Sequence, residues 1–356
     1  INQSTIPTLD VKSDRLLGLV NRSLAVANQE ENAFVIVPMV AEFVQRRKPT
    51  TVAETGNRIQ DLAFELVSEY GHNRYDRFPM LDDAWAMLDA SLSRFLAGPN
   101  DPLQAVCEAL FQYFNFSGRW DESLFLNREA ESRAVAAGDI HNAGYRAYHA
   151  AWVHHLRGQA DEMMRCAERA SQHWRRAESG IPEQVKASRM HGIAHEMKNE
   201  FPAALEAYQE ALRLCRTTEA ESRDVANVLN DIAEAERLSG NYEAADTNYR
   251  EAIRIARNVG EDSDAVTFAG NLAELALARE NWNDAEVLAR DALEFAENIG
   301  RQDLIASNCN RLAGALVRLG KKSEAQPLAQ RAVQIYTDLG SPNVEVARQT
   351  LTDCEG

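Results

Sequence analysis

The sequence has little of what marks a disulfide-bonded, membrane-spanning or nucleic-acid-binding protein. Five cysteines occur among 356 residues, irregularly spaced and without a Cys-x-x-Cys pair, which argues against a disulfide scaffold or zinc ribbon and for reduced thiols in the cytoplasm. The longest apolar stretch, Ala33 to Val44, is short and interrupted by Pro38 and Glu42, so we expect no membrane span. Acidic residues outnumber basic ones by 54 to 38, and the net charge of −16 disfavours nucleic acid as a partner.

What the sequence does contain is a short turn that recurs six times. Each copy opens with Gly, Asn or Glu and leads into a stretch of helical periodicity. Hydrophobic residues make up 45% of the chain, enough for a sizeable core. The third residue of the turn recurs every 40 or 41 residues and is aromatic in four copies: Trp120, Ala160, Phe201, Tyr242, Trp282 and Lys322. A constant period of this kind predicts stacked repeats rather than unrelated domains.

Small residues recur at two further positions of the same repeat. Ten residues after the third residue of each turn the sequence has alanine: Ala130, Ala170, Ala211, Ala252, Ala292 and Ala332. Nine residues before it, five of the six positions are small: Phe111, Ala151, Gly192, Ala233, Ala273 and Ala313. Small residues let two helices approach closely, so each unit is predicted to be a helix pair that buries its apolar face by stacking. The expected fold class is all-α, an α-α superhelix.

Together, the turn, its aromatic residue and both small positions resemble the tetratricopeptide repeat (TPR), in a 40-residue form, over residues 103–343. Residues 227–233 and 308–313 are similar to the first helices of the kinesin-light-chain-like subgroup. Ala160 and Lys322 depart from the aromatic pattern. The resemblance implies a TPR-like solenoid that binds a protein or peptide ligand on the side lined by the first helix of each pair. Residues 344–356 are expected to form a terminal cap and tail.

The segment before the repeats has a different pattern. Residues 51–102 show helical spacing with a break at 71–79, which predicts an irregular helix pair leading into the solenoid. Within residues 1–50, a helix at Leu16–Arg22 precedes a β-branched run and a second helix at Pro38–Arg47. This order resembles the winged-helix end of STAND signalling ATPases of the NB-ARC type.

The winged-helix resemblance implies that the chain is the C-terminal sensor region of such an ATPase, with a nucleotide-binding module before Ile1. The chain itself contains no GxxxxGK[ST] motif, so we expect no ATP hydrolysis from it. The alternative is an autonomous peptide-sensing TPR transcription regulator whose residues 10–48 contact DNA. Six basic and five acidic residues in that segment offer little phosphate affinity.

A ligand groove is predicted from the family resemblance and from the polar and aromatic residues of the first helices. Asparagine amides donate and accept hydrogen bonds at once, so they can pair with the backbone of an extended peptide. Tyrosine and tryptophan offer stiff anchor surfaces, and arginine binds carboxylates through two hydrogen bonds. The predicted groove residues are Tyr145, Tyr148, His149, Trp152, Arg189, Asn227, Asn230, Asp231, Asn271, Asn310 and Arg311.

Catalytic and metal-binding patterns are weak in this sequence. His191 and His195 are four residues apart on a predicted helix, the spacing of a metal pair, but Gly192 stands where the HExxH motif has its glutamate. Sister repeats carry packing residues at these positions, so we interpret both histidines as part of a helix seam. No nucleophile motif accompanies them. We therefore expect no enzyme activity, cofactor or metal, and the ligand and oligomeric state stay open.

Overall fold

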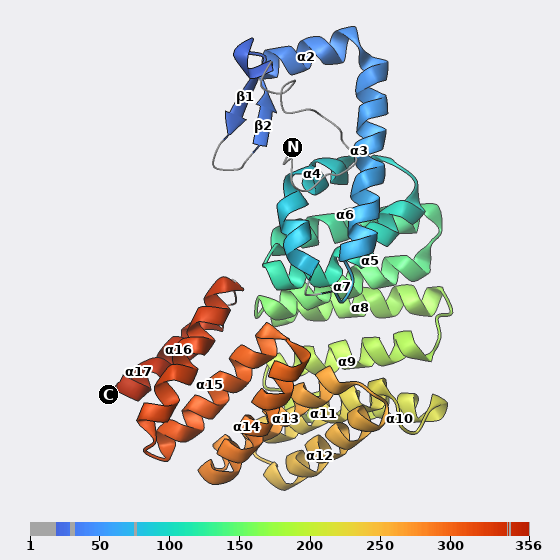
Figure 1. Cartoon of the computed structure of the whole chain (residues 1–356). Coiled ribbons are helices and arrows are strands. Elements are labelled where there is room, and N and C mark those ends of the chain that lie inside the picture. The colour runs from blue at the N-terminus through green and yellow to red at the C-terminus, as the bar shows by residue number, and fades with distance from the viewer. Residues whose placement is uncertain (1–18, 29–32, 75–76, 340, 342, 356) are drawn as a thin grey trace. The chain divides into compact units, whose positions relative to one another are not determined.

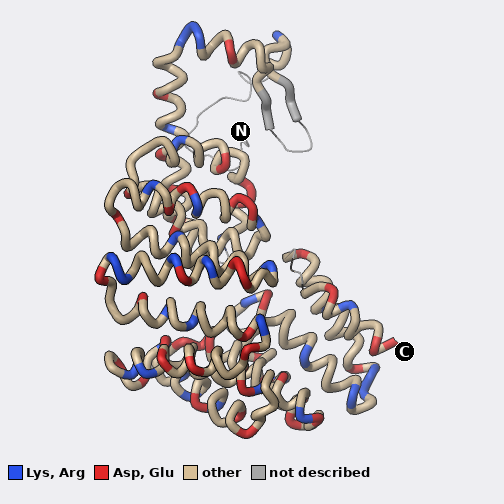
Figure 2. Tube along the Cα trace, turned by 180° about the vertical axis from the view of Figure 1, so that it is seen from behind, with Lys and Arg blue, Asp and Glu red and all other residues tan. Residues whose placement is uncertain are grey.

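A computed structural model describes residues 19–28, 33–74, 77–339, 341 and 343–355 (Figure 1). The chain divides into two compact units, residues 1–113 and 114–356. Asp and Glu are interspersed with Lys and Arg along the helices of both units (Figure 2). Within the described residues, no helix is long and apolar enough to cross a membrane.

The first unit contains a small hairpin and a helix pair. Strands β1 (Ala25–Asn28) and β2 (Ala33–Ile36) are antiparallel, and α2 (Pro38–Arg47) follows with the predicted bounds. The helix predicted at Leu16–Arg22 falls largely outside the described residues, of which Leu19 to Asn21 are helical.

Helices α3 (Pro49–Tyr70) and α4 (Phe78–Ala97) confirm the predicted pair with its break. Proline in the first turn starts each of these helices, because its fixed φ suits that turn and its missing N–H is not needed there. Phe78, Leu81 and Leu88 form part of the core. The hydroxyl of Tyr113 on α5 (Asn100–Ser117) donates to Asp82 over 2.6 Å.

The second unit is a stack of helix pairs, as the repeat predicts (Figure 1). Every helix from α6 to α17 packs against the next one along the chain. First helices of the pairs are α7 (Ile140–Leu156), α9 (Ile181–Met197), α11 (Arg223–Leu238), α13 (Asp262–Ala278) and α15 (Gln302–Arg318). Second helices are α6 (Trp120–Ala137), α8 (Ala160–Arg176), α10 (Phe201–Thr218), α12 (Tyr242–Asn258), α14 (Trp282–Ile299) and α16 (Lys322–Asp338), and α17 (Val344–Glu355) follows them.

The six turns share one backbone conformation. The residue that opens each turn has a positive φ: Gly118, Gly158, Asn199, Gly240, Glu280 and Gly320. Glycine reaches this region without steric cost, whereas Asn199 (59°) and Glu280 (56°) adopt it at some cost. In five of the six turns the residue after it donates its N–H to a carbonyl five residues back, as from Gln159 to His154, which closes the preceding helix.

Both small positions lie in the core of the solenoid. The six recurring alanines are at most 1% exposed. A Cβ added to Gly192 would lie 2.3 Å from the ring of Tyr208, so only glycine lets these helices approach so closely. Burial of these positions confirms the α-α superhelix. The predicted domain limits at residues 50, 102 and 343 lie beside the starts of α3, α5 and α17 and stay predictions.

Candidate ligand-binding groove

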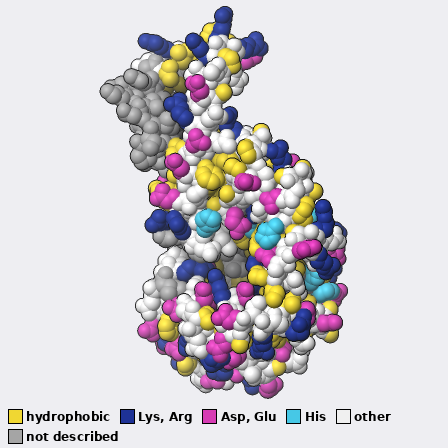
Figure 3. All heavy atoms as spheres, turned by 90° about the vertical axis from the view of Figure 1, so that its right-hand side faces the viewer, with side chains coloured by type: hydrophobic (Ala, Val, Ile, Leu, Met, Phe, Trp, Pro, Cys, Tyr) yellow, Lys and Arg dark blue, Asp and Glu magenta, His cyan; other side chains and the backbone are white. Residues whose placement is uncertain are grey.

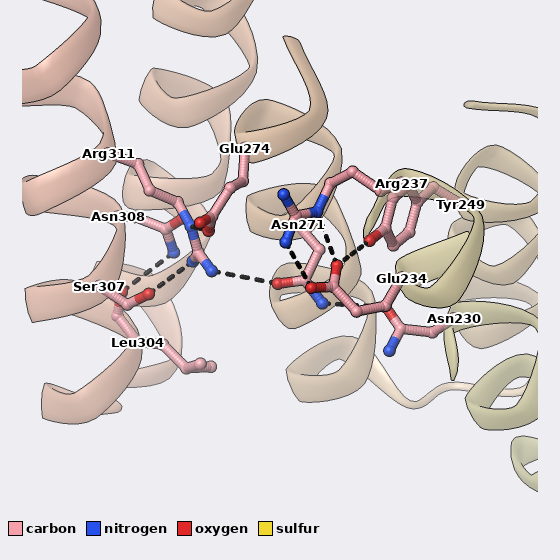
Figure 4. Close-up of polar contacts among 10 residues, drawn as sticks. All are labelled: Asn230, Glu234, Arg237, Tyr249, Asn271, Glu274, Leu304, Ser307, Asn308 and Arg311. Carbon is pink, nitrogen blue, oxygen red and sulfur yellow. Dashed lines mark hydrogen bonds and ion pairs between the residues drawn. The ribbon is translucent and has the colours of Figure 1, made fainter. Parts of the chain in front are cut away.

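Hydrogen bonds across the repeats join side chains at equivalent or adjacent positions of the first helices. Asn271 on α13 donates to the side-chain oxygen of Asn230 on α11 over 3.0 Å. Arg311 on α15 in turn donates to the oxygen of Asn271 over 3.1 Å (Figure 4). Further toward the N-terminus, Arg189 on α9 holds Asp231 through two hydrogen bonds of 2.6 and 3.2 Å. We call this row of side chains, from Arg189 to Arg311, the polar ladder.

Arg311 ends the ladder with three kinds of acceptor. Besides Asn271, its guanidinium contacts Glu274 at 3.0 Å and the hydroxyl of Ser307 at 2.5 Å. Glu234, one turn beyond Asn230 on α11, receives the hydroxyl of Tyr249 at 2.5 Å and the guanidinium of Arg237 (Figure 4). The charged groups of Arg311, Glu274, Glu234 and Arg237 are therefore each paired with a group of opposite charge.

Glu196 on α9 differs from the other carboxylates of the region. Burial first, and then the negative charges of Glu234 and Asp231, raise its pKa to about 8. The hydroxyl of Tyr208 donates to Glu196 over 3.2 Å. The carboxyl group is therefore largely protonated at neutral pH, so it can donate as well as accept a hydrogen bond.

Aromatic rings gather at the α7 end of the same row. Tyr145 and Tyr148 lie with their centroids 5.3 and 5.9 Å from the ring of Trp174 on α8. Tyr148 also meets Trp152 edge to face at 6.4 Å, and the hydroxyl of Tyr145 donates to Glu183 over 2.8 Å. These contacts make one continuous aromatic cluster, which we call the aromatic end.

His149 is only 1% exposed, so it packs among the helices and is not available to a ligand, contrary to the prediction. Burial, and next the charge of Arg146, holds the pKa of His149 well below its usual value, which keeps the ring neutral. Asn227 donates to the carbonyl of Arg223 on its own helix. The side-chain oxygen of Asn310 is buried, with no hydrogen-bond partner among the described residues. Ligand contact by the remaining groove residues stays a prediction.

Two tyrosines that the sequence reasoning missed reach the row from second helices. Tyr208 on α10 and Tyr249 on α12 bind Glu196 and Glu234 through their hydroxyls. They occupy the same position of successive repeats, 41 residues apart, and that recurrence was the available signal.

The two histidines of the predicted helix seam have separate surroundings. His195 lies 2.6 Å from the carboxylate of Glu200, while Nε2 of His191 is buried with no partner in the described part of the chain. Nowhere in that part do three or more His, Cys, Asp or Glu side chains gather closely enough to hold a metal ion.

The geometry defines a stack of TPR-like helix pairs, and comparisons with known proteins agree. Residues 224–298 match the tetratricopeptide repeat family. No curated protein matches the chain. Among solved structures, a Rap protein complexed with Competence and Sporulation Factor superposes with a TM-score of 0.55 at 15% identity, over 86% of this chain and 98% of that one.

Two further structures have the same fold. A STAND protein with a tetratricopeptide repeat sensor from Pyrococcus horikoshii superposes with a TM-score of 0.54 at 14% identity, over 96% of this chain and 54% of that one. Aspartyl phosphate phosphatase F from Bacillus subtilis gives 0.52 at 12% identity, over 84% and 92%. Likeness at these identities establishes the fold alone. These comparisons do not show that the first 50 residues resemble a winged helix.

Proposed function

We propose that the chain is a non-catalytic module that binds a protein or peptide ligand along its first helices. The observation that carries the proposal is the polar ladder, which runs without a break from α11 to α15. The contact between Asn230 and Asn271 uses one donor and one acceptor, and each amide has further hydrogen-bonding capacity. An extended peptide backbone offers donors and acceptors at a regular spacing that such a row can match.

The charges of the row are mixed in sign and paired, as in Arg189 with Asp231 and Arg311 with Glu274, which fits a mixed polar ligand rather than a strongly charged one. On the face in Figure 3, acidic, basic and hydrophobic side chains are interspersed. A nucleic acid would need a basic stripe instead, because phosphate neutralisation supplies most of its affinity.

The test uses a random dodecapeptide display library selected on the whole chain. Peptides from the selection are expected to bind the wild type and to lose about tenfold or more in affinity for Asn230→Ala/Asn271→Ala, since two hydrogen-bonding side chains disappear. The control is Asn258→Ala, at the exposed end of α12, which should bind as the wild type does. Failure to select any peptide, or equal binding by all three proteins, contradicts the proposal.

For the larger protein, we propose that the chain is the sensor region of a STAND-type signalling ATPase. Support comes from the Pyrococcus horikoshii structure, a STAND protein with a tetratricopeptide repeat sensor, of which this chain matches 54%. The hairpin and α2 fit the small domain expected before the repeats. The encoding gene provides the test: a P-loop and a following Asp-containing strand upstream of Ile1 would support this role, and their absence would end it.

The second candidate is an autonomous peptide-sensing regulator. It is favoured by the Rap structure complexed with Competence and Sporulation Factor, because this chain matches nearly the whole length of that protein. In its transcription-regulator form, residues 10–48 contact DNA. Salt-dependent binding of the chain to duplex DNA, measured by fluorescence anisotropy, would support that form, and no binding at low salt would contradict it.

A further inference from the structure

Gly314 is unlike the other glycines within described helices. Glycine is unfavourable inside a helix, so it usually has a packing reason. A Cβ added at Gly144 or Gly192 would lie 2.3 Å from the ring of Trp174 or Tyr208. At Gly56 and Gly270 it would lie 2.4 and 2.7 Å from the guanidinium groups of neighbouring arginines. At Gly314 on α15 it would meet no heavy atom within 4 Å, so packing does not require glycine there.

The four preceding repeats carry a side chain at the position of Gly314. This position lies eight residues before the third residue of the next turn, and it is occupied by Trp152, Ile193, Glu234 and Glu274. Gly314 lines a pocket of about 360 Å³ beside the ladder. It is bordered by α11, α13, α15, the start of α14, and α17.

The pocket has both apolar and charged side chains in its lining. Leu277, Ala278 and Val317 line it, with Trp282 at one side. The guanidinium of Arg318 lies 5.7 Å from the centroid of the Trp282 ring. Two charged residues that line the pocket already have partners in or beside the polar ladder. Arg237 pairs with Glu234, and Glu274 pairs with Arg311.

We propose that this pocket receives a bulky apolar side chain, of the size of Leu, Met or Phe, from a peptide bound along the ladder. The inference rests on the proposed function and adds a subsite to it. A charged side chain would find Arg237 and Glu274 already paired, Arg318 over the ring of Trp282, and Asp353 hydrogen-bonded by Gln349. The surface of Leu277, Ala278 and Val317, in contrast, lacks the side chain that would cover it. Burial of that surface by an apolar group is favourable, and the large apolar residues at two equivalent positions, Trp152 and Ile193, have the matching size.

The test fills the pocket from within. Gly314→Ile places there the residue that α9 carries at the equivalent position, and Gly314→Ala is the matched control with a single methyl group. Both variants are expected to fold, with thermal melting followed by circular dichroism no lower than in the wild type. The probe is a positional-scanning library of acetylated, amidated hexapeptides, and binding of each pool is measured by isothermal titration calorimetry.

Pools that fix Leu, Met or Phe at one position are expected to bind the wild type about tenfold or more tightly than pools that fix Ala, Asp or Lys there. Gly314→Ile should lose this preference while it keeps the binding that depends on Asn230 and Asn271. Gly314→Ala should keep most of the preference.

Each other result overturns the inference. Pools that bind without an apolar preference, or a preference unchanged in Gly314→Ile, remove the subsite and leave the groove in place. Absence of binding by every pool removes both the groove and the subsite. A Gly314→Ala variant that melts well below the wild type would mean that packing does require glycine here, and the pocket would then need no ligand to explain it.

Discussion

The two ends of the first-helix row use different chemistry to fill the same repeat positions. At the aromatic end, Tyr145, Tyr148 and Trp152 contact one another or Trp174. Along the polar ladder, Arg189 and Asn230 occupy the position of Tyr148, and each bonds to a side chain of the next repeat. Two glycines differ in a similar way, since Gly144 on α7 admits the ring of Trp174 while Gly314 on α15 borders open space.

The difference separates packing from ligand binding. Aromatic rings in mutual contact gain their free energy from burial within the protein, and they have little further surface to offer a ligand. Hydrogen-bonded amides near solvent contribute little net stability, and they can exchange partners with a ligand at small cost. We therefore expect substitutions at the aromatic end to change folding stability, and substitutions of the ladder amides to change binding more than stability.

Trp174→Ala should have the largest effect on stability. Trp174 is 2% exposed, contacts both Tyr145 and Tyr148, and donates its indole N–H to the carbonyl of His141. Loss of a buried tryptophan typically costs about 3–5 kcal/mol in unfolding free energy, which urea titration followed by circular dichroism would measure. The matched control is Trp282→Ala at the polar end, where the ring is only partly buried. Equal losses of unfolding free energy in the two variants would contradict the expected difference between the aromatic end and the polar ladder.

Arg189→Ala should have the next largest effect on stability. Arg189 is the first residue of the polar ladder and lies next to the aromatic end in the row. The side chains of Arg189 and Asp231 are 17% and 13% exposed, so removal of the guanidinium leaves a largely buried carboxylate without its partner. We expect a loss of about 2–3 kcal/mol, somewhat less than for a fully buried pair.

The double variant Arg189→Leu/Asp231→Leu should recover most of that loss, since it removes both charges. Arg254→Ala is the control, because its pair with Glu221 lies on the exposed side, and its stability should be close to that of the wild type. A double variant no more stable than Arg189→Ala would show that the charge left on Asp231 is not the cause.

The fold could be predicted from the sequence because its determinants are local and repeated. The residue that opens each turn needs a left-handed conformation, and four of the six copies are glycine, the residue that adopts it most readily. The recurring alanines are at helix contacts in every repeat, so one copy explains the others. Short patterns of β-branched and apolar residues likewise predicted the hairpin and α2.

The site was less predictable because it depends on how each helix is rotated against its neighbours. Tyr148 and His149 are adjacent in the sequence, but a turn of about 100° between them leaves Tyr148 partly exposed and buries His149. The contact of Arg189 with Asp231 joins residues 42 apart, and no pattern within one repeat specifies it. Tyr208 and Tyr249 were missed because they reach the row from second helices.

Glu196→Gln should change how stability depends on pH. The folded protein holds a proton on this carboxyl up to a pKa of about 8, whereas the ordinary value of 4.5 applies after unfolding. Between these values the folded state binds more protons, so the free energy of unfolding falls as pH rises, by up to about 1.4 kcal/mol per pH unit.

Glutamine stays neutral and removes this slope, so the variant should gain stability relative to the wild type from pH 5 to pH 8. Urea midpoints of both proteins at four pH values would measure the difference. The groups that face Glu196 are Asp231, Glu234, Arg237 and Tyr208, and they are present in both proteins. Parallel pH profiles would mean that Glu196 is ionised in the folded state and that the two nearby carboxylates do not raise its pKa.

The smallest effect, and the one that separates the two ends most directly, concerns their glycines. Gly314→Ala replaces a helix residue at a point of open space, so we expect a gain of about 0.5–1 kcal/mol from helix propensity alone. Gly144→Ala makes the same chemical change at the aromatic end, but its methyl group would lie 2.3 Å from the ring of Trp174, so stability should fall. Opposite signs in parallel urea titrations would show that one glycine serves packing and the other keeps a space open, whereas losses in both would place Gly314 in the packed core.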